Sequence, residues 1–206
     1  MRAILIYSKR GGACFVPHVA LSAIFSRSAL RANLKLTMTQ GFSPRAKISF
    51  APELPAGVVA LNEPVEIYFD DAQVLPENLQ EIFNAALPAG FAINRIYFPD
   101  TNLSLGKLCY QAVYLIRSSR ISPEDLQRLL LEFYADEILR LEIENENDWL
   151  NLLIKNPAKN GIGLFVKKLI SENLIQGWQD MNIVRESIGN FHGKFFVNEI
   201  GSVNID

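Results

Sequence analysis

Two short stretches in the first quarter of the sequence combine side chains that could bind an anion. The first is SKRGG, residues 8–12, in which two glycines can turn backbone N–H groups outward beside two cations. The second is TQGFSPRAKISFAP, residues 39–52, which carries aromatic rings, a stiffening proline and two cations separated by one alanine. Together they predict a site for a phosphate group and for a base stacked on an aromatic ring.

The residues predicted to bind nucleic acid come from both stretches and from the start of the first expected helix. Cations would attract the backbone, a glutamine and a phenylalanine would contact a base, and a histidine would position a phosphate or hydroxyl group. The cations are Lys9, Arg10, Arg45 and Lys47. The base contacts are Gln40 and Phe42, and the histidine is His18. The turn glycines Gly11, Gly12 and Gly41 complete the set. Two alternatives stay open, namely Phe42 as part of the core and His18 in a local hydrogen bond to the turn.

Charge is distributed unevenly along the chain. Residues 1–52 contain eight cations and no Asp or Glu, which leaves 12 cations against 22 acids in the rest of the sequence. A one-sided positive field attracts phosphate, and phosphate contacts supply most of the non-specific affinity for nucleic acid. The alternative is that these cations are scattered over a solvated face or offset by acids from the second half.

Composition sets the class of protein. A chain of 206 residues with 49% hydrophobic and 20% charged residues is expected to form a globular core. The uncharged run Ala3–Tyr7 is too short for a signal peptide or a membrane span, so we expect a cytoplasmic protein without membrane contact. Cys14 and Cys109 lie far apart and outside any CxxC motif, which excludes a four-ligand zinc or iron–sulfur site. We expect two buried, reduced thiols, no metal and no cofactor in this chain.

Hydrophobic periodicity predicts an α+β fold made of two tandem ferredoxin-like units, each with the order β-α-β-β-α-β. The expected domains are a basic one over residues 1–100 and an acidic one over residues 107–206. The first unit is expected to contain strands at 2–8, 47–51, 64–70 and 92–98, helices at 17–32 and 76–87, and a second strand or the approach to one at 34–38.

The second unit is expected to repeat the same order of elements. Ser122 precedes Pro123 and two acids, which is the pattern of a helix N-terminus. The run ILRLEIE alternates apolar and charged residues, as a strand with one solvated face does. The expected elements are strands at 108–116, 138–144, 149–155 and 182–188 and helices at 122–134 and 163–173.

Residues 7–69 also carry a longer motif. Its members are Ser8, Lys9, Gly12, His18, Gln40, Gly41, Phe42, Pro44, Lys47, Ser49, Phe50, Pro55 and Gly57. In order and spacing they resemble the radical-SAM-linked protein family, a bacterial domain of unknown function fused to or encoded beside radical S-adenosylmethionine enzymes. The chain departs from that pattern at Ala20 and Arg45, where the family carries Asp and His, so it lacks two groups that acid–base or metal chemistry would use.

Three functions from different classes follow from these observations. The first is an accessory module that binds or delivers RNA, such as tRNA or ribosomal RNA, to a separate radical-SAM enzyme, because this chain has no CxxxCxxC motif of its own. The second is a metal-independent endoribonuclease resembling CRISPR repeat-processing enzymes, with His18 as general base. The third is a protein-docking module. We expect the first, with no catalytic residue in the chain.

Overall fold

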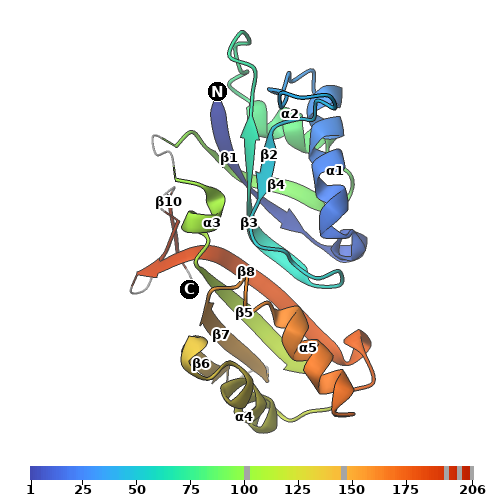
Figure 1. Ribbon diagram of the computed structural model, residues 1–206, viewed down its shortest axis with the longest axis vertical. Coiled ribbons are helices and arrows are strands. Elements are labelled where there is room, and N and C mark those ends of the chain that lie inside the picture. Colours follow the sequence, from blue (N-terminus) through green and yellow to red (C-terminus); the bar gives the residue numbers. More distant parts are fainter. Residues whose placement is uncertain (100–102, 145–147, 193–194, 199–200, 205–206) are drawn as a thin grey trace.

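The computed structural model describes residues 1–99, 103–144, 148–192, 195–198 and 201–204. Figure 1 shows two units stacked along the long axis, with the N-terminal half above and the C-terminal half below. The first unit contains β1 (Arg2–Lys9), the 3-10 helix η1 (Gly11–Phe15), α1 (His18–Arg31), β2 (Ile48–Phe50), β3 (Val59–Tyr68), α2 (Leu79–Ala86) and β4 (Phe91–Tyr97).

The second unit repeats the order of strands and helices. It contains β5 (Gln111–Ser118), α4 (Pro123–Tyr134), η2 (Ala135–Glu137), β6 (Ile138–Glu144), β7 (Trp149–Lys155), α5 (Ile162–Ser171), η3 (Trp178–Asp180) and β8 (Met181–His192). The short helix α3 (Leu105–Leu108) precedes this unit, and β9 (Phe195–Asn198) and β10 (Gly201–Asn204) follow it. The protein is therefore a mixed α+β fold.

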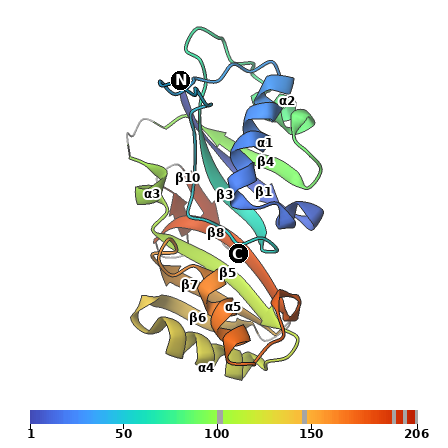
Figure 2. The same cartoon turned by 45° about the vertical axis from the view of Figure 1, so that its right-hand side comes forward.

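One mostly antiparallel sheet runs through both units in the order β4-β1-β3-β8-β5-β7-β6. The two units join where β8 pairs with β3. This pairing is possible because the short β2 pairs with β3 only at residues 65–67 and leaves the start of β3 free. There β8 pairs in parallel, with Val59 opposite Val184 and Ala60 opposite Arg185. Both views show β8 passing below β3 at this point (Figures 1 and 2).

The core of the first unit centres on Phe25, which α1 inserts between the sheet and α2. Phe25 is fully buried, and its ring centroid lies 5.0 Å from that of Tyr7, 5.8 Å from Phe50 and 6.2 Å from Phe83. The pairs with Tyr7 and Phe50 are edge-to-face, an arrangement that stabilises the core beyond the apolar area that each ring buries. This cluster of aromatic rings fixes α1 against β1 and β2, and thus fixes the helix face that remains outside.

The second core joins the two units. It consists mainly of residues from β5, β7, α4 and α5, but it also includes Ile4 and Ile6 of β1 and Val58 and Ala60 beside the joint. The two units therefore share buried surface instead of meeting through a flexible linker. The division into domains of residues 1–100 and 107–206 remains a prediction, and its boundary falls partly on residues 100–102, outside the described residues.

Local sequence signals account for several element boundaries. The Ser122 hydroxyl accepts a hydrogen bond from the Asp125 N–H at 3.2 Å and so caps α4, with Pro123 as the first helical residue. The strand predicted from Leu108 instead begins at Gln111, because residues 105–108 form α3. The tail after residue 190 extends the sheet through β9 and β10.

Two features of the first unit depend on contacts between distant residues. Of the two alternatives for residues 34–38, the approach to a strand is the one observed, because only Leu36 and Met38 make isolated bridges, to Phe69 and Ala46. The face of β3 that carries Glu66 and Tyr68 is less solvated than the alternation in PVEIYFD suggests. Its Glu66 is only 6% exposed and accepts a hydrogen bond from Arg2 Nε at 2.6 Å, because a neighbouring strand supplies a cation for it.

Replacement of Phe25 by alanine should destabilise the protein by about 3–5 kcal/mol, because the variant loses buried area and leaves a cavity between α1 and the sheet. Val19 lies on the same helix with 86% of its surface exposed, so Val19→Ala should change the free energy of unfolding by no more than about 0.5 kcal/mol. Urea unfolding of both variants measures the difference. Similar losses in the two would show that α1 is packed differently.

Candidate nucleic-acid interface

Residues 35–47 form a hairpin-like projection, which we call the finger. Its two sides are joined by the hydrogen bond from the Thr39 N–H to the Arg45 carbonyl at 2.7 Å and by a bridge between Met38 and Ala46. Its base is tied to the end of β3, where the Thr37 N–H donates to the Tyr68 carbonyl at 2.8 Å. The stretch singled out by the sequence is therefore an ordered projection with paired sides.

The tip of the finger presents Phe42 to solvent. The relative exposure of Phe42 is 110%, so it is not part of the core, which decides one alternative left open by the sequence. Gly41 beside it has a φ of 137°, a backbone conformation that L side chains rarely adopt, and no atom lies within 4 Å of where its Cβ would be. The glycine is thus needed for the turn and not for space.

A groove of about 1020 Å³ lies between the finger and the outer face of α1. The helix contributes a stripe with helical spacing that lies opposite its buried face: Val19, Ser22, Ala23, Ser26, Arg27 and Leu30. The segment after the helix and the finger contribute the other wall: Asn33, Leu34, Lys35, Leu36, Met38, Pro44, Arg45 and Ala46. Asp70 is the one acid among these lining residues.

The groove carries three cations against the single carboxylate of Asp70. Arg27, Lys35 and Arg45 are exposed and line the groove, and no ion pair involves them within the described part of the chain. Lys47 stands at the finger base with its Nζ 3.8 Å from the centroid of the Tyr68 ring. Unpaired cations on both walls make the groove attractive to an anionic chain.

The residues of the SKRGG turn lie elsewhere. Lys9 is only 2% exposed, and its ammonium donates to the Val16 carbonyl at 3.3 Å, so it is not a surface cation. Burial lowers its pKa. Arg10, Gly11 and Gly12 are exposed, but they precede the first turn of α1, whereas the finger follows its last turn (Figures 1 and 2). The expectation that both stretches line one hollow is therefore corrected, since of the predicted residues only Arg45 lines the groove.

His18 is the first residue of α1 and is half-buried. Its ring packs edge-on against Phe50, with centroids 5.5 Å apart. The next residue, Val19, lines the groove, but His18 does not. Burial lowers the pKa of His18 below the usual 6.5. The effect of burial is larger than that of the nearby charges, of which Glu53, the most important, raises the pKa. The imidazole is therefore mostly neutral at pH 7.

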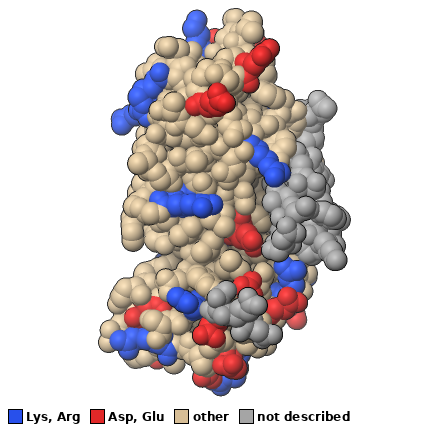
Figure 3. Space-filling model, turned by 180° about the vertical axis from the view of Figure 1, so that it is seen from behind, with Lys and Arg blue, Asp and Glu red and all other residues tan. Residues whose placement is uncertain are grey.

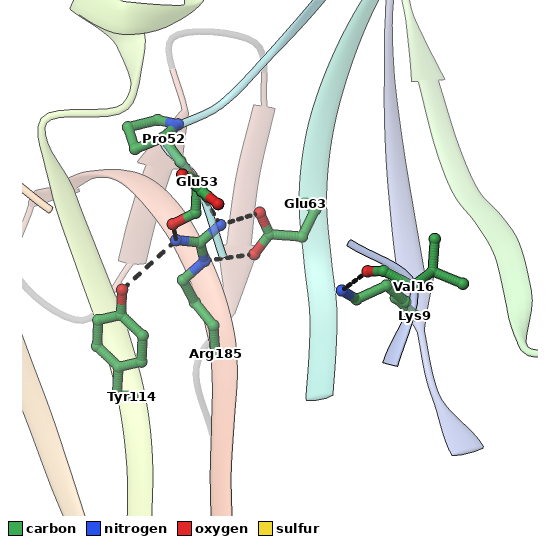
Figure 4. A network of polar contacts seen from close by, with 7 residues as sticks. All are labelled: Lys9, Val16, Pro52, Glu53, Glu63, Tyr114 and Arg185. Carbon is green, nitrogen blue, oxygen red and sulfur yellow. Dashed lines mark hydrogen bonds and ion pairs between the residues drawn. The ribbon is translucent and has the colours of Figure 1, made fainter. Parts of the chain in front are cut away.

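A buried ion pair that the sequence did not indicate fastens the two units together. Arg185 on β8 is 1% exposed and donates both Nε and Nη2 to Glu63 on β3, with Nε 2.7 Å from the carboxylate (Figure 4). The same guanidinium donates to the Pro52 and Glu53 carbonyls and to the Tyr114 hydroxyl. Although burial alone would lower the pKa of Arg185, the Glu63 carboxylate raises it overall, so the guanidinium stays charged.

The remaining surface offers fewer signs of a binding site. Seen from behind, the molecule carries few charged side chains over its middle, and both signs are intermixed on the second unit (Figure 3). In the described ranges, no group of three or more His, Cys, Asp or Glu side chains could hold a metal ion. Cys14 and Cys109 are buried free thiols. None of the helices described is both long and apolar enough to cross a bilayer.

Some groove residues could have been found from the sequence. Val19 and Leu30 occupy the stripe of α1 that faces away from Leu21 and Phe25, so apolar residues on both helix faces were a signal of a second contact surface. Lys35 was counted only as part of the charge excess. Arg185 carried no signal, since a lone arginine in a strand is normally exposed.

Replacement of Arg185 by methionine should destabilise the protein by about 3–5 kcal/mol, because Glu63 would be left as an unpaired buried charge. The double change Arg185→Met with Glu63→Leu should recover much of that loss. Arg128→Met, which breaks an exposed pair with Asp125, should cost no more than about 1 kcal/mol. Denaturant unfolding of these variants beside the parent chain measures the differences, and a double variant as unstable as the single one would argue against this assignment.

Acidification should destabilise the protein through His18. Its pKa is lower in the folded chain than the usual 6.5, so the unfolded chain binds more protons, and the contribution of His18 to stability is lost as pH falls through 6.5 towards the folded value. Above 6.5 that contribution is complete. A ring titration by NMR should give a midpoint below 6.5, and His18→Gln should flatten the stability profile in this window. An unchanged profile would mean that the histidine is solvated.

Comparison with known proteins identifies the family of this chain but assigns it no activity. No curated protein matches the chain. The crystal structure of an unknown protein from Galdieria sulphuraria aligns with 91% of this chain and 98% of its own, at 11% identity and a TM-score of 0.29, a likeness too weak to bear on the fold. Residues 2–151 match the model of a family described as "Uncharacterized protein conserved in bacteria (DUF2344)". This match covers well over half of the sequence, and the chain therefore belongs to the DUF2344 family.

Proposed function

We propose that this protein is an accessory module that binds RNA between the finger and α1 and delivers it to a separate enzyme. The observation that carries the proposal is the set of three cations on the two walls of one groove, Arg27, Lys35 and Arg45, none of which forms an ion pair with another described residue. Phosphate contacts by such cations supply most of the non-specific affinity of proteins for nucleic acid. Phe42 at the finger tip adds an exposed ring of the kind on which bases stack.

The identity of the partner rests on the sequence motif. The resemblance of residues 7–69 to the radical-SAM-linked protein family suggests a radical-SAM enzyme on another chain, and the proposal places both in the cytoplasm, acting on tRNA or ribosomal RNA. We also propose that the two units are ferredoxin-like. The repeated order β-α-β-β-α-β and the strand orders β4-β1-β3-β2 and β8-β5-β7-β6 support this.

The endoribonuclease alternative is less well supported by the geometry. A general base must reach the hydroxyl group that it deprotonates. His18 is neutral at pH 7, as a base should be, but its ring packs against Phe50 and lies outside the groove. Protein docking remains the other outcome of the experiment below.

Charge reversal in the groove should weaken RNA binding far more than the same change elsewhere. The double variant Lys35→Glu/Arg45→Glu should bind labelled RNA more weakly at low salt. The slope of log K against log salt should fall by about 0.7 for each phosphate that the variant no longer neutralises. The matched control is Lys159→Glu/Lys167→Glu, which reverses two exposed cations of the second unit.

Fluorescence anisotropy between about 50 and 200 mM salt measures both effects, with gel analysis of the same samples for cleavage. Equal losses in the two double variants would remove the groove from the proposal. Binding of an acidic protein partner with no RNA binding would favour docking. Cleaved RNA that disappears in His18→Ala would favour the nuclease.

A further inference from the structure

We infer that the groove takes an unpaired, single-stranded stretch of RNA and not a duplex. The inference rests on the proposed function and adds the form of RNA that the site selects. It follows from three properties of the same surface: its apolar lining, the ring at the finger tip, and the distribution of its cations.

The lining of the groove is more apolar than a surface that contacts only phosphates. Val19 is 86% exposed, Leu30 75% and Met38 51%, and all three line the groove. Such side chains gain free energy only when apolar or aromatic surface covers them. A base-paired helix keeps its base faces stacked inside and offers phosphates, sugars and base edges. Unpaired bases expose the flat faces that this lining requires.

Phe42 points to the same form of RNA. Its ring is fully exposed, and the finger that carries it is held by paired backbone bonds on both sides and by Gly41 at the turn. An ordered platform loses little conformational freedom when a base stacks on it. Stacking on a protein ring needs a base that has left its own stack, and every base has such a face.

The cations lie where a single strand could follow them. Arg27 is on the helix wall, whereas Lys35 and Arg45 are on the opposite wall, so positive charge borders the apolar lining on both sides. One backbone passing between them could place phosphates on the walls and bases on the lining. This arrangement is typical of sites that bind single strands without reading their sequence.

An acidic peptide helix could pair with the same cations, but it would not cover the aromatic ring at the finger tip. Phe42 does not line the groove, so a short rigid helix seated on α1 would leave the ring uncovered. A flexible strand can continue from the groove around the finger tip and cover both. We therefore assign the groove to single-stranded RNA and treat a peptide as an outcome of the experiment.

The test compares one labelled RNA strand of mixed sequence, free and annealed to its complement, by fluorescence anisotropy with the full chain. The single strand should bind at least about tenfold more tightly than the duplex. Phe42→Ala should weaken the single strand by about 5- to 150-fold, the loss of one stacked base, and leave duplex binding unchanged. Phe98→Ala removes another exposed phenylalanine, outside the groove, and should change neither affinity.

Each outcome separates the inference from the proposed function. Equal affinity for both forms, abolished in Lys35→Glu/Arg45→Glu, would overturn the single-strand inference and keep RNA binding. Equal effects of Phe42→Ala and Phe98→Ala would also overturn it. Failure to bind either form would overturn both. Displacement of the labelled strand by poly-glutamate at lower concentrations than by unlabelled single-stranded RNA would assign the groove to an acidic protein. Because Phe42 has no buried surface, Phe42→Ala should keep the fold.

Discussion

The ion pair between Arg185 and Glu63 is the contact on which the arrangement of the two units depends. Removing two charges from water costs several kcal/mol per ion, and only good geometry with further hydrogen bonds offsets that cost. Here the guanidinium bonds to both carboxylate oxygens, to two carbonyls of the loop after β2 and to a tyrosine of β5. It therefore fixes β8 against β3, and it holds the loop that follows β2, next to the strand at which the finger ends.

Local signals predicted most helices and strands of this fold. The cap at Ser122 and the alternation in ILRLEIE depend on neighbours in sequence, and the structure places a helix and a strand there. The finger was not predicted, because its pairing joins backbone groups of residues 37–47 with no hydrophobic period. The burial of Glu66 and Arg185 could not be predicted either, since each depends on a partner far away in the chain.

The candidate site was predicted in part. The stretch that its glycine, proline, aromatic ring and cations single out lies in the finger, and its ring is exposed. The SKRGG turn was joined to it on the assumption that loops at strand ends meet, but α1 has 14 residues and separates the two by about 20 Å along its axis. Arg27 and Lys35 were missed because the outer stripe of an amphipathic helix is normally only solvated.

The three-residue length of β2 also has a consequence for the nascent chain. The first two residues of β3, Val59 and Ala60, have an edge that β8 covers. More than 110 residues separate the end of β3 from the start of β8, so β8 is synthesised much later. Until then the open edge can pair with another copy of the chain. Ribosome-bound intermediates longer than the first unit but lacking β8 therefore expose a strand edge that the finished protein hides, at the place where its own C-terminal unit will attach.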